Sequence, residues 1–274
     1  MSLKYKILVL DIDGTLTNSK KEIPPRTKSA ILKAQEKGAI VALASGRPSP
    51  GITHVANELE LDRFGGYVLS FNGGVITNYQ TKEVIFEKVL PDGVIPVLYE
   101  EAKKAGVAIV SYLDDAIVTE TPEAKYIDYE AFLNHMKVVK VDDFVDTLRS
   151  PVTKCLMVGD PEILVKEEER LKKKLGDRLN VFRSEPFFLE IMPQNIDKAY
   201  SLNKLLKHLK MTREEMIACG DGFNDRSMIE FAGLGVAMCN AQPEVKAVAD
   251  LVTLTNDEEG VALVVEDYML KEEA

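Results

Sequence analysis

Two carboxylates follow the first apolar run of the sequence. Ile7 to Leu10 has the pattern of a strand buried on both faces, and Asp11-Ile12-Asp13-Gly14 comes directly after it. Because ligands of open α/β sheets bind beyond the carboxyl ends of strands, Asp11 and Asp13 can face one crevice. Their oxygens favour Mg²⁺, and a carboxylate can also attack phosphorus to form an acyl-phosphate. An ordinary acidic turn would use the same residues, so this motif alone does not identify a site.

A second motif could hold phosphate oxygens. Ser45-Gly46-Arg47-Pro48 follows another apolar run, Val41 to Ala44. The Ser45 hydroxyl and the backbone N–H of Gly46 are suitable donors, and Pro48 suits the start of a helix whose N-terminus attracts anions. Arg47 is a candidate for contact with substrate. The same letters also occur in simple turns.

Two more polar residues lie beside predicted elements. Lys198 begins a helix-like stretch, 197–209, where its charge opposes the helix dipole. This position gives a small reason to expect a task such as neutralising phosphate, and an ordinary solvated lysine is an equally good interpretation of the local sequence. Asn72 follows the predicted strand 67–71 and can either contact substrate or form a tight turn.

The last motif is Gly-Asp-Gly-Phe-Asn-Asp at 220–225, again directly after a predicted strand. Asp221 is placed to be a further oxygen ligand of a metal ion. Asn224 could bind phosphate, and Asp225 could bind the metal or orient Lys198. A capped helix start uses the same residue types, so this motif indicates a site only together with the other three.

The elements that must position these residues alternate between strand and helix patterns. This alternation predicts a doubly wound parallel sheet, a Rossmann-like α/β core formed by 1–84 and 192–274. Between them, 85–191 shows hairpin and antiparallel strand patterns with helices. We therefore expect an inserted α+β domain in that range.

Composition limits the possible partners and compartments. The 274 residues carry a formal net charge of −10, which disfavours nucleic acid and anionic membranes as partners. No apolar run approaches the ~20 residues of a membrane span, and the N-terminus does not resemble a signal peptide. We expect a cytoplasmic protein with its three cysteines buried as free thiols.

The four motifs as a set resemble those of the haloacid dehalogenase-like (HAD) superfamily of phosphohydrolases. The order D-x-D-G-T, S-G-R, lysine, G-D-x-x-N-D is most similar to its Cof-type subfamily, which includes sugar-phosphate phosphatases. The resemblance covers nearly the whole chain. It implies a Mg²⁺-dependent phosphatase of small phosphorylated metabolites, with 85–191 as a C2-type cap domain.

The resemblance also implies a role for each motif residue. Asp11 would be the nucleophile, and Asp13 would first protonate the leaving alcohol and then activate water. The metal would be held by Asp11, the backbone carbonyl of Asp13 and Asp221. The phosphoryl group would be held by Ser45, Lys198 and Asn224.

Two other functions use the same motifs. A phosphosugar mutase would form the same aspartyl-phosphate but pass the phosphoryl group to another sugar hydroxyl. A binding module on an inactive catalytic fold is less consistent with the sequence, because both Asp11 and Asp13 are present.

Overall fold

The chain forms two compact units. A computed structural model describes residues 3–271. The first unit comprises Met1–Phe86 and Asp197–Ala274, and the second comprises Glu87–Ile196. The sequence predicted boundaries at 84/85 and 191/192, two and five residues earlier, and the last strand of the second unit continues to Pro193 rather than Ile191.

The first unit is built on one eight-stranded sheet, with strand order β14-β13-β12-β1-β2-β3-β4-β5. All neighbours from β14 to β3 are parallel, as predicted, whereas β4 is antiparallel to β3. A connection of only four residues, 71–74, can reverse the chain but cannot cross over to a parallel strand. The strands are Ile7–Leu10 (β1), Ile40–Ala44 (β2), Tyr67–Ser70 (β3), Val75–Asn78 (β4), Val84–Glu87 (β5), Met216–Gly220 (β12), Leu234–Ala237 (β13) and Leu251–Val252 (β14).

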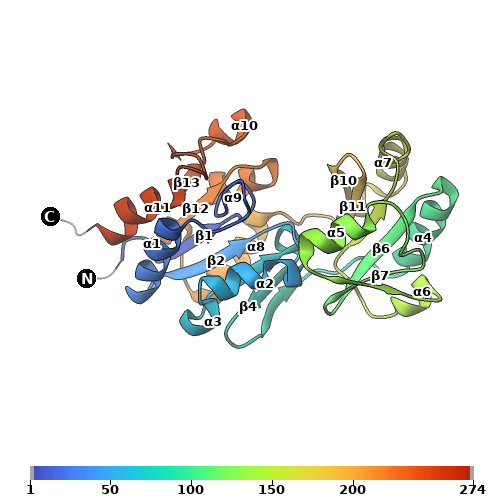
Figure 1. Ribbon diagram of the computed structural model, residues 1–274, viewed down its shortest axis with the longest axis horizontal. Helices are drawn as coiled ribbons and strands as arrows, with labels where there is room; N and C mark the ends of the chain where they lie inside the picture. The colour runs from blue at the N-terminus through green and yellow to red at the C-terminus, as the bar shows by residue number, and fades with distance from the viewer. Residues whose placement is uncertain (1–2, 272–274) are drawn as a thin grey trace. The chain divides into compact units, whose positions relative to one another are not determined.

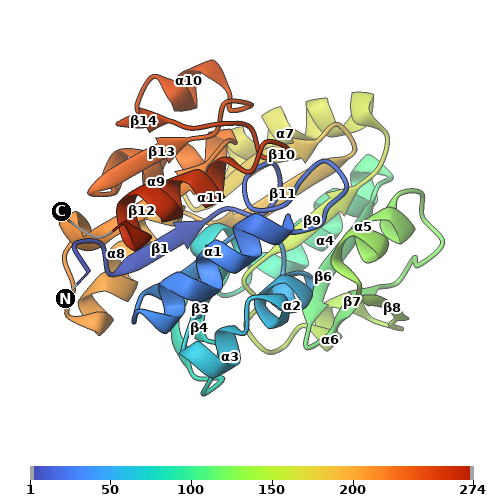
Figure 2. The same ribbon diagram turned by 60° about the vertical axis from the view of Figure 1, so that its left-hand side comes forward.

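Helices cover both faces of this sheet. The sheet grows in opposite directions from β1, so right-handed crossovers place α1 and α2 on one face and α9 on the other. Helices α1 and α11 lie side by side (Figures 1 and 2). The helices of this unit are Pro25–Glu36 (α1), Ser49–Glu58 (α2), Leu61–Phe64 (α3), Lys198–Leu209 (α8), Arg226–Phe231 (α9), Pro243–Lys246 (α10) and Gly260–Val265 (α11).

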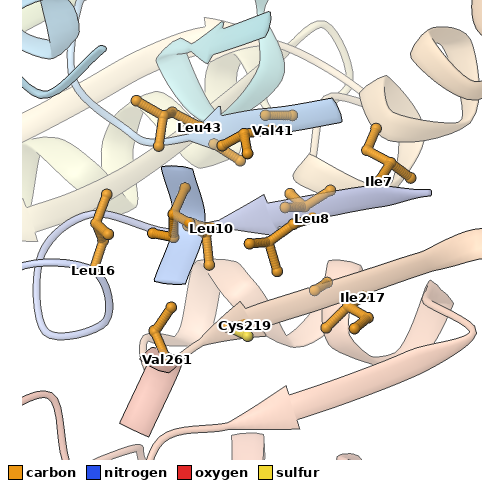
Figure 3. Packing of buried hydrophobic residues seen from close by; sticks show 14 of the residues in the cluster. Ile7, Leu8, Leu10, Leu16, Val41, Leu43, Ile217, Cys219 and Val261 are labelled. Carbon is orange, nitrogen blue, oxygen red and sulfur yellow. The ribbon is translucent and has the colours of Figure 1, made fainter. Parts of the chain in front are cut away.

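The central strands are apolar on both faces because both faces are covered. All four residues of β1 are fully buried, and they pack against neighbours on β2, β12 and α11, such as Leu43, Ile217 and Val261 (Figure 3). A strand in this position cannot alternate apolar and polar residues, which explains its continuous apolar sequence. The rigid centre of the sheet therefore supports the loops that follow β1, β2 and β12.

The second unit has its own six-stranded sheet, with order β10-β11-β9-β6-β7-β8, and its own apolar core. The sheet is antiparallel as expected, except that β7 and β8 are parallel, since helix α5 connects them as a crossover. The strands are Ala108–Leu113 (β6), Ala116–Thr119 (β7), Lys137–Lys140 (β8), Cys155–Val158 (β9), Leu179–Glu185 (β10) and Phe188–Pro193 (β11). The helices are Val94–Ala105 (α4), Ile127–Asn134 (α5), Phe144–Thr147 (α6) and Pro161–Leu175 (α7).

Two further expectations concern individual features. Cys155 and Cys219 are buried, but Cys239 is exposed, because it lies in the loop beyond β13 rather than in the strand. Across residues 3–271, none of the helices has the length and apolar character needed to cross a lipid bilayer.

Candidate active site

The predicted site residues follow the carboxyl ends of neighbouring parallel strands. Asp11 follows β1, Ser45 follows β2 and Asp221 follows β12. The pairing register sets Leu10 beside both Leu43 and Cys219, so these strands end at nearly the same level. The sheet thus gathers residues that are more than 200 positions apart in the sequence.

Lys198 is the buried centre of the charged cluster. Its ammonium donates to Asp11 Oδ1 at 2.7 Å and to Asp225 Oδ1 at 2.5 Å, and the side chain is fully buried. Burial by itself would lower the pKa of Lys198, but the two carboxylates outweigh burial and raise it. Lys198 is therefore a permanent cation at the first position of α8.

The helix start tolerates this cation because another residue caps it. The Asp197 carboxylate accepts a hydrogen bond from the backbone N–H of Tyr200 at 2.7 Å. This cap satisfies a backbone N–H in the first turn of α8, which the Lys198 ammonium cannot do because it is only a donor. The expected opposition between lysine and helix dipole is thus compensated locally by Asp11, Asp225 and the cap.

Asp225 holds both Lys198 and the loop before it. While its Oδ1 accepts from Lys198, its Oδ2 accepts from the backbone N–H groups of Asp221 at 2.9 Å and Gly222 at 2.8 Å. Of the two roles left open for Asp225, these contacts support orientation of Lys198. Asp225 is also close enough to take part in a metal site.

Three carboxylates form a group that fits a divalent cation. Asp11, Asp221 and Asp225 each offer an oxygen, and these oxygens lie within 4.8 Å of one another. Burial, with the negative charge of Asp225, raises the pKa of Asp11 to about 8, and burial raises the pKa of Asp221 to about 6. The cluster thus has more negative charge than Lys198 balances, and its hard oxygen donors are those that Mg²⁺ prefers.

Gly14 and Thr15 fix Asp221 from the opposite loop. Gly14 has a φ of +84°, and a Cβ there would lie 2.4 Å from Asp221 Oδ2. Thr15 donates its hydroxyl hydrogen to Asp221 Oδ1 at 2.7 Å. Sequence reasoning did not assign Thr15 a role, although its place in D-x-D-G-T was a signal.

Asp13 faces a pair of cations. Arg47 binds it through two nitrogens, Nε to Oδ2 at 2.8 Å and Nη2 to Oδ1 at 2.7 Å, and Lys21 Nζ lies 2.8 Å from Oδ1. Burial raises the pKa of Asp13, but Arg47 and then Lys21 outweigh burial and lower it. Asp13 is therefore an ionised carboxylate here. Sequence reasoning missed Lys21, because a lysine in a polar loop carries no local signal.

The remaining predicted residues form a polar group around the second motif. The Ser45 hydroxyl is buried and accepts from the backbone N–H of Arg47 at 3.2 Å. Asn224 donates to Asn72 Oδ1 at 2.9 Å, and Asn72 lies against Gly46. All ten predicted residues are thus linked by contacts or chain neighbourhood at one edge of the sheet.

Comparison with known proteins agrees with this geometry. The model of the haloacid dehalogenase-like hydrolase family matches residues 8–265. The chain is 30% identical to the putative phosphatase YxeH of Bacillus subtilis, with 97% of this chain and 99% of that protein covered.

Two solved structures share its fold. A haloacid dehalogenase-like hydrolase from Bacteroides thetaiotaomicron is 54% identical, with a TM-score of 0.93 over 96% of this chain and 99% of that one. The subclass IIB sugar phosphatase BT4131 is 26% identical, with a TM-score of 0.81 over 96% and 98%. With the family model spanning most of the sequence, the chain belongs to the haloacid dehalogenase-like hydrolase family and is one of its phosphatases.

Proposed function

We propose that this enzyme hydrolyses small phosphomonoesters, sugar phosphates among them, through a phosphoryl group carried on Asp11. The observation that carries the proposal is the buried contact between Asp11 and Lys198. A carboxylate held beside a permanent cation at a strand end can attack phosphorus while the cation balances the charge of the phosphoryl oxygens.

The first step transfers the phosphoryl group to the protein. A carboxylate oxygen of Asp11 forms a bond to phosphorus as the bond from phosphorus to the leaving oxygen breaks. Asp13 gives its proton to that oxygen, so the product leaves as an alcohol. Because Arg47 and Lys21 favour the ionised form of Asp13, these contacts must loosen when substrate binds.

The second step releases phosphate. Asp13, now ionised, takes a proton from a water molecule whose oxygen attacks phosphorus, and the bond to Asp11 breaks. Its low pKa is consistent with an ionised carboxylate that Arg47 can orient. Ser45 and Asn224 are the proposed hydrogen-bond donors to the phosphoryl oxygens in both steps.

Mg²⁺ is the proposed cofactor. Asp11, the backbone carbonyl of Asp13 and Asp221 would hold it, and Asp225 would support them from behind through its bonds to the Asp221 loop. Bound there, the ion would supply positive charge for the phosphoryl oxygens. The raised pKa values of Asp11 and Asp221 support a cation at this position.

The substrate class rests on the relatives. BT4131 is described as a sugar phosphatase, and the second unit, 87–196, stands where the family's C2 cap is expected. We infer that the second unit is this cap and that it selects among small phosphorylated metabolites.

Phosphate release from a panel of sugar phosphates and other small phosphomonoesters tests this proposal. We expect release with Mg²⁺, none with EDTA, and none from Asp11→Asn. Asp62→Asn, which removes an exposed carboxylate from α3, is the matched control and should keep full activity. An isomeric sugar phosphate in place of free phosphate would instead identify a mutase.

The covalent step can be tested separately. Asp13→Asn removes the proposed acid of the first step and the base of the second, so the test uses an aryl phosphate, whose leaving group needs no proton and keeps the first step fast. Mass spectrometry of the rapidly quenched variant should then find one added phosphoryl group on the peptide that contains Asp11. A phosphorylated peptide elsewhere, or active Asp11→Asn, would refute the proposed nucleophile.

A further inference from the structure

The turn after β3 has an unusual backbone. Three consecutive residues have positive φ: Phe71 at 53°, Asn72 at 54° and Gly73 at 91°. Glycine adopts such angles readily and asparagine tolerates them, but a phenylalanine rarely does. Strain of this kind persists only where surrounding contacts enforce it, and it often marks functional positions.

Contacts from two other motifs enforce this turn. The backbone N–H of Phe71 donates to the Arg47 carbonyl at 3.0 Å, and that of Asn72 donates to the Ser45 carbonyl at 2.9 Å. On the other side, the Ser201 hydroxyl of α8 donates to the Gly73 carbonyl at 2.6 Å. The turn is therefore fixed to the loop that holds Ser45 and to the helix that begins with Lys198.

The side chain of Asn72 has contacts of its own. A Cβ placed on Gly46 would lie only 3.3 Å from Asn72 Oδ1, so the absence of a side chain at Gly46 makes room for the Asn72 amide. Asn72 Oδ1 in turn accepts a hydrogen bond from Asn224 Nδ2 at 2.9 Å.

Asn224 needs such a partner because it is exposed. An exposed amide rotates freely among rotamers, whereas the bond to Asn72 uses one hydrogen of Nδ2 and leaves the second directed by that bond. Asn72 can thus determine where Asn224 presents its remaining N–H.

We propose that Asn72 is a positioning residue, which acts on the phosphoryl group through Asn224 rather than by contacting substrate itself. This inference rests on the proposed function, in which Asn224 donates to a phosphoryl oxygen. It also gives the strained turn a role, because the left-handed residue Asn72 lies between Gly46 and Asn224.

A double-mutant cycle on kcat/KM for a sugar phosphate tests the inference with Asn72→Gly, Asn224→Ala and the double variant. Glycine suits the left-handed backbone, so Asn72→Gly should fold normally. We expect Asn72→Gly to lower kcat/KM about ten-fold, and the double variant to be no worse than Asn224→Ala alone, since coupled residues are non-additive.

Lys210→Gly is the matched control. Like Asn72→Gly, it replaces a residue of positive φ, here 55° at the exposed end of α8, and it should leave kcat/KM unchanged. Additive losses in the cycle would show that Asn72 acts independently of Asn224 and would overturn the inference, as would an unchanged Asn72→Gly. The failure of the proposed function looks different: the wild-type protein itself would then hydrolyse no phosphomonoester. An active wild-type protein with additive losses would overturn only the role of Asn72.

Discussion

At the scale of single residues, the site depends on how buried charge is balanced. Lys198 is fully buried between Asp11 and Asp225, whereas Asp13 is partly exposed between Arg47 and Lys21. Losing one member of a buried ion group leaves buried hydrogen-bonding groups without their partners, but losing a partly exposed pair costs little. The two kinds of carboxylate should therefore respond differently to the same substitution.

Asp225→Asn and Asp13→Asn test this difference. Asp225→Asn should lower the free energy of unfolding by about 3 kcal/mol, because both oxygens of the buried Asp225 accept hydrogen bonds and an asparagine has only one acceptor oxygen. Asp13→Asn should change it by less than about 1 kcal/mol. Its phosphatase activity should nevertheless fall by at least about 100-fold, the usual contribution of acid–base catalysis. Denaturant unfolding and phosphate-release assays on both variants make the measurement; equal losses of stability would contradict this account.

The raised pKa values of Asp11 and Asp221 predict a pH dependence of metal binding. A carboxyl whose pKa rises on folding binds more protons in the folded state, so stability falls as pH rises from about 3.8 to the folded value. That window ends near pH 6 for Asp221 and near pH 8 for Asp11. The proposed Mg²⁺ should cancel this loss, since it would bind the ionised carboxylates.

The increase in melting temperature on adding Mg²⁺ should accordingly be larger at pH 8 than at pH 5. We expect a difference of at least about 3 °C, the shift that roughly 1 kcal/mol gives in a chain of this size. Thermal unfolding with Mg²⁺ and with EDTA at both pH values provides the measurement. The same Mg²⁺ effect at pH 5 and pH 8 would argue against a metal on these two carboxylates.

At the scale of elements, the loops after the strands are shaped by close approaches. Gly14 directly follows Asp13, and its left-handed φ lets the loop turn against Asp221. Gly38, which ends α1, has a similar φ of +92° but no atom within 4 Å of the position a Cβ would take. The two glycines thus share a backbone requirement and differ only in their surroundings.

Gly14→Ala and Gly38→Ala separate these effects. Gly38→Ala should cost about 1 kcal/mol from the left-handed backbone alone. Gly14→Ala should cost about 2 kcal/mol more, because its methyl group would displace Asp221. Mg²⁺ affinity should fall about ten-fold in Gly14→Ala only, as when a metal ligand loses its support. Calorimetric titration with Mg²⁺ measures this; equal affinity in both variants would show that Asp221 does not depend on Gly14.

At the scale of the whole molecule, two units have separate apolar cores. The core of the first unit contains the strands that carry the site, while the core of the second contains Phe144 and apolar residues of helices α4 and α7. The strands of the two units form two separate hydrogen-bonded sheets. A substitution that disrupts one core should therefore lower the stability of its own unit first.

Phe144→Ala tests this independence. Phe144 is fully buried and stacks on Tyr99, so its loss should destabilise the second unit by about 3 kcal/mol or more. Amide hydrogen exchange should become faster in 87–196 and stay nearly unchanged in β1 and β12. Leu8→Ala, in the first core, should reverse this pattern. Uniformly faster exchange in either variant would indicate that the two units unfold as one.

The sequence by itself determined the elements and the composition of the site. Continuous apolar runs identify β1, β2 and β12 as strands covered on both faces, and polar residues directly after them must lie at strand ends. Since these signals are local, Asp11, Ser45 and Asp221 could be selected without a structure. The resemblance to a known family then supplied their expected roles.

Only the tertiary structure decided which of these residues touch. Sequence could not choose between the two roles of Asp225, nor foresee that Arg47 and Lys21 hold Asp13 or that Asn72 meets Asn224. Lys21 lies in a polar loop without any motif, and Asn72 and Asn224 are 152 positions apart. Such contacts depend on strand order, register and loop backbone angles, which arise from packing across the whole sheet rather than from neighbouring residues in the chain.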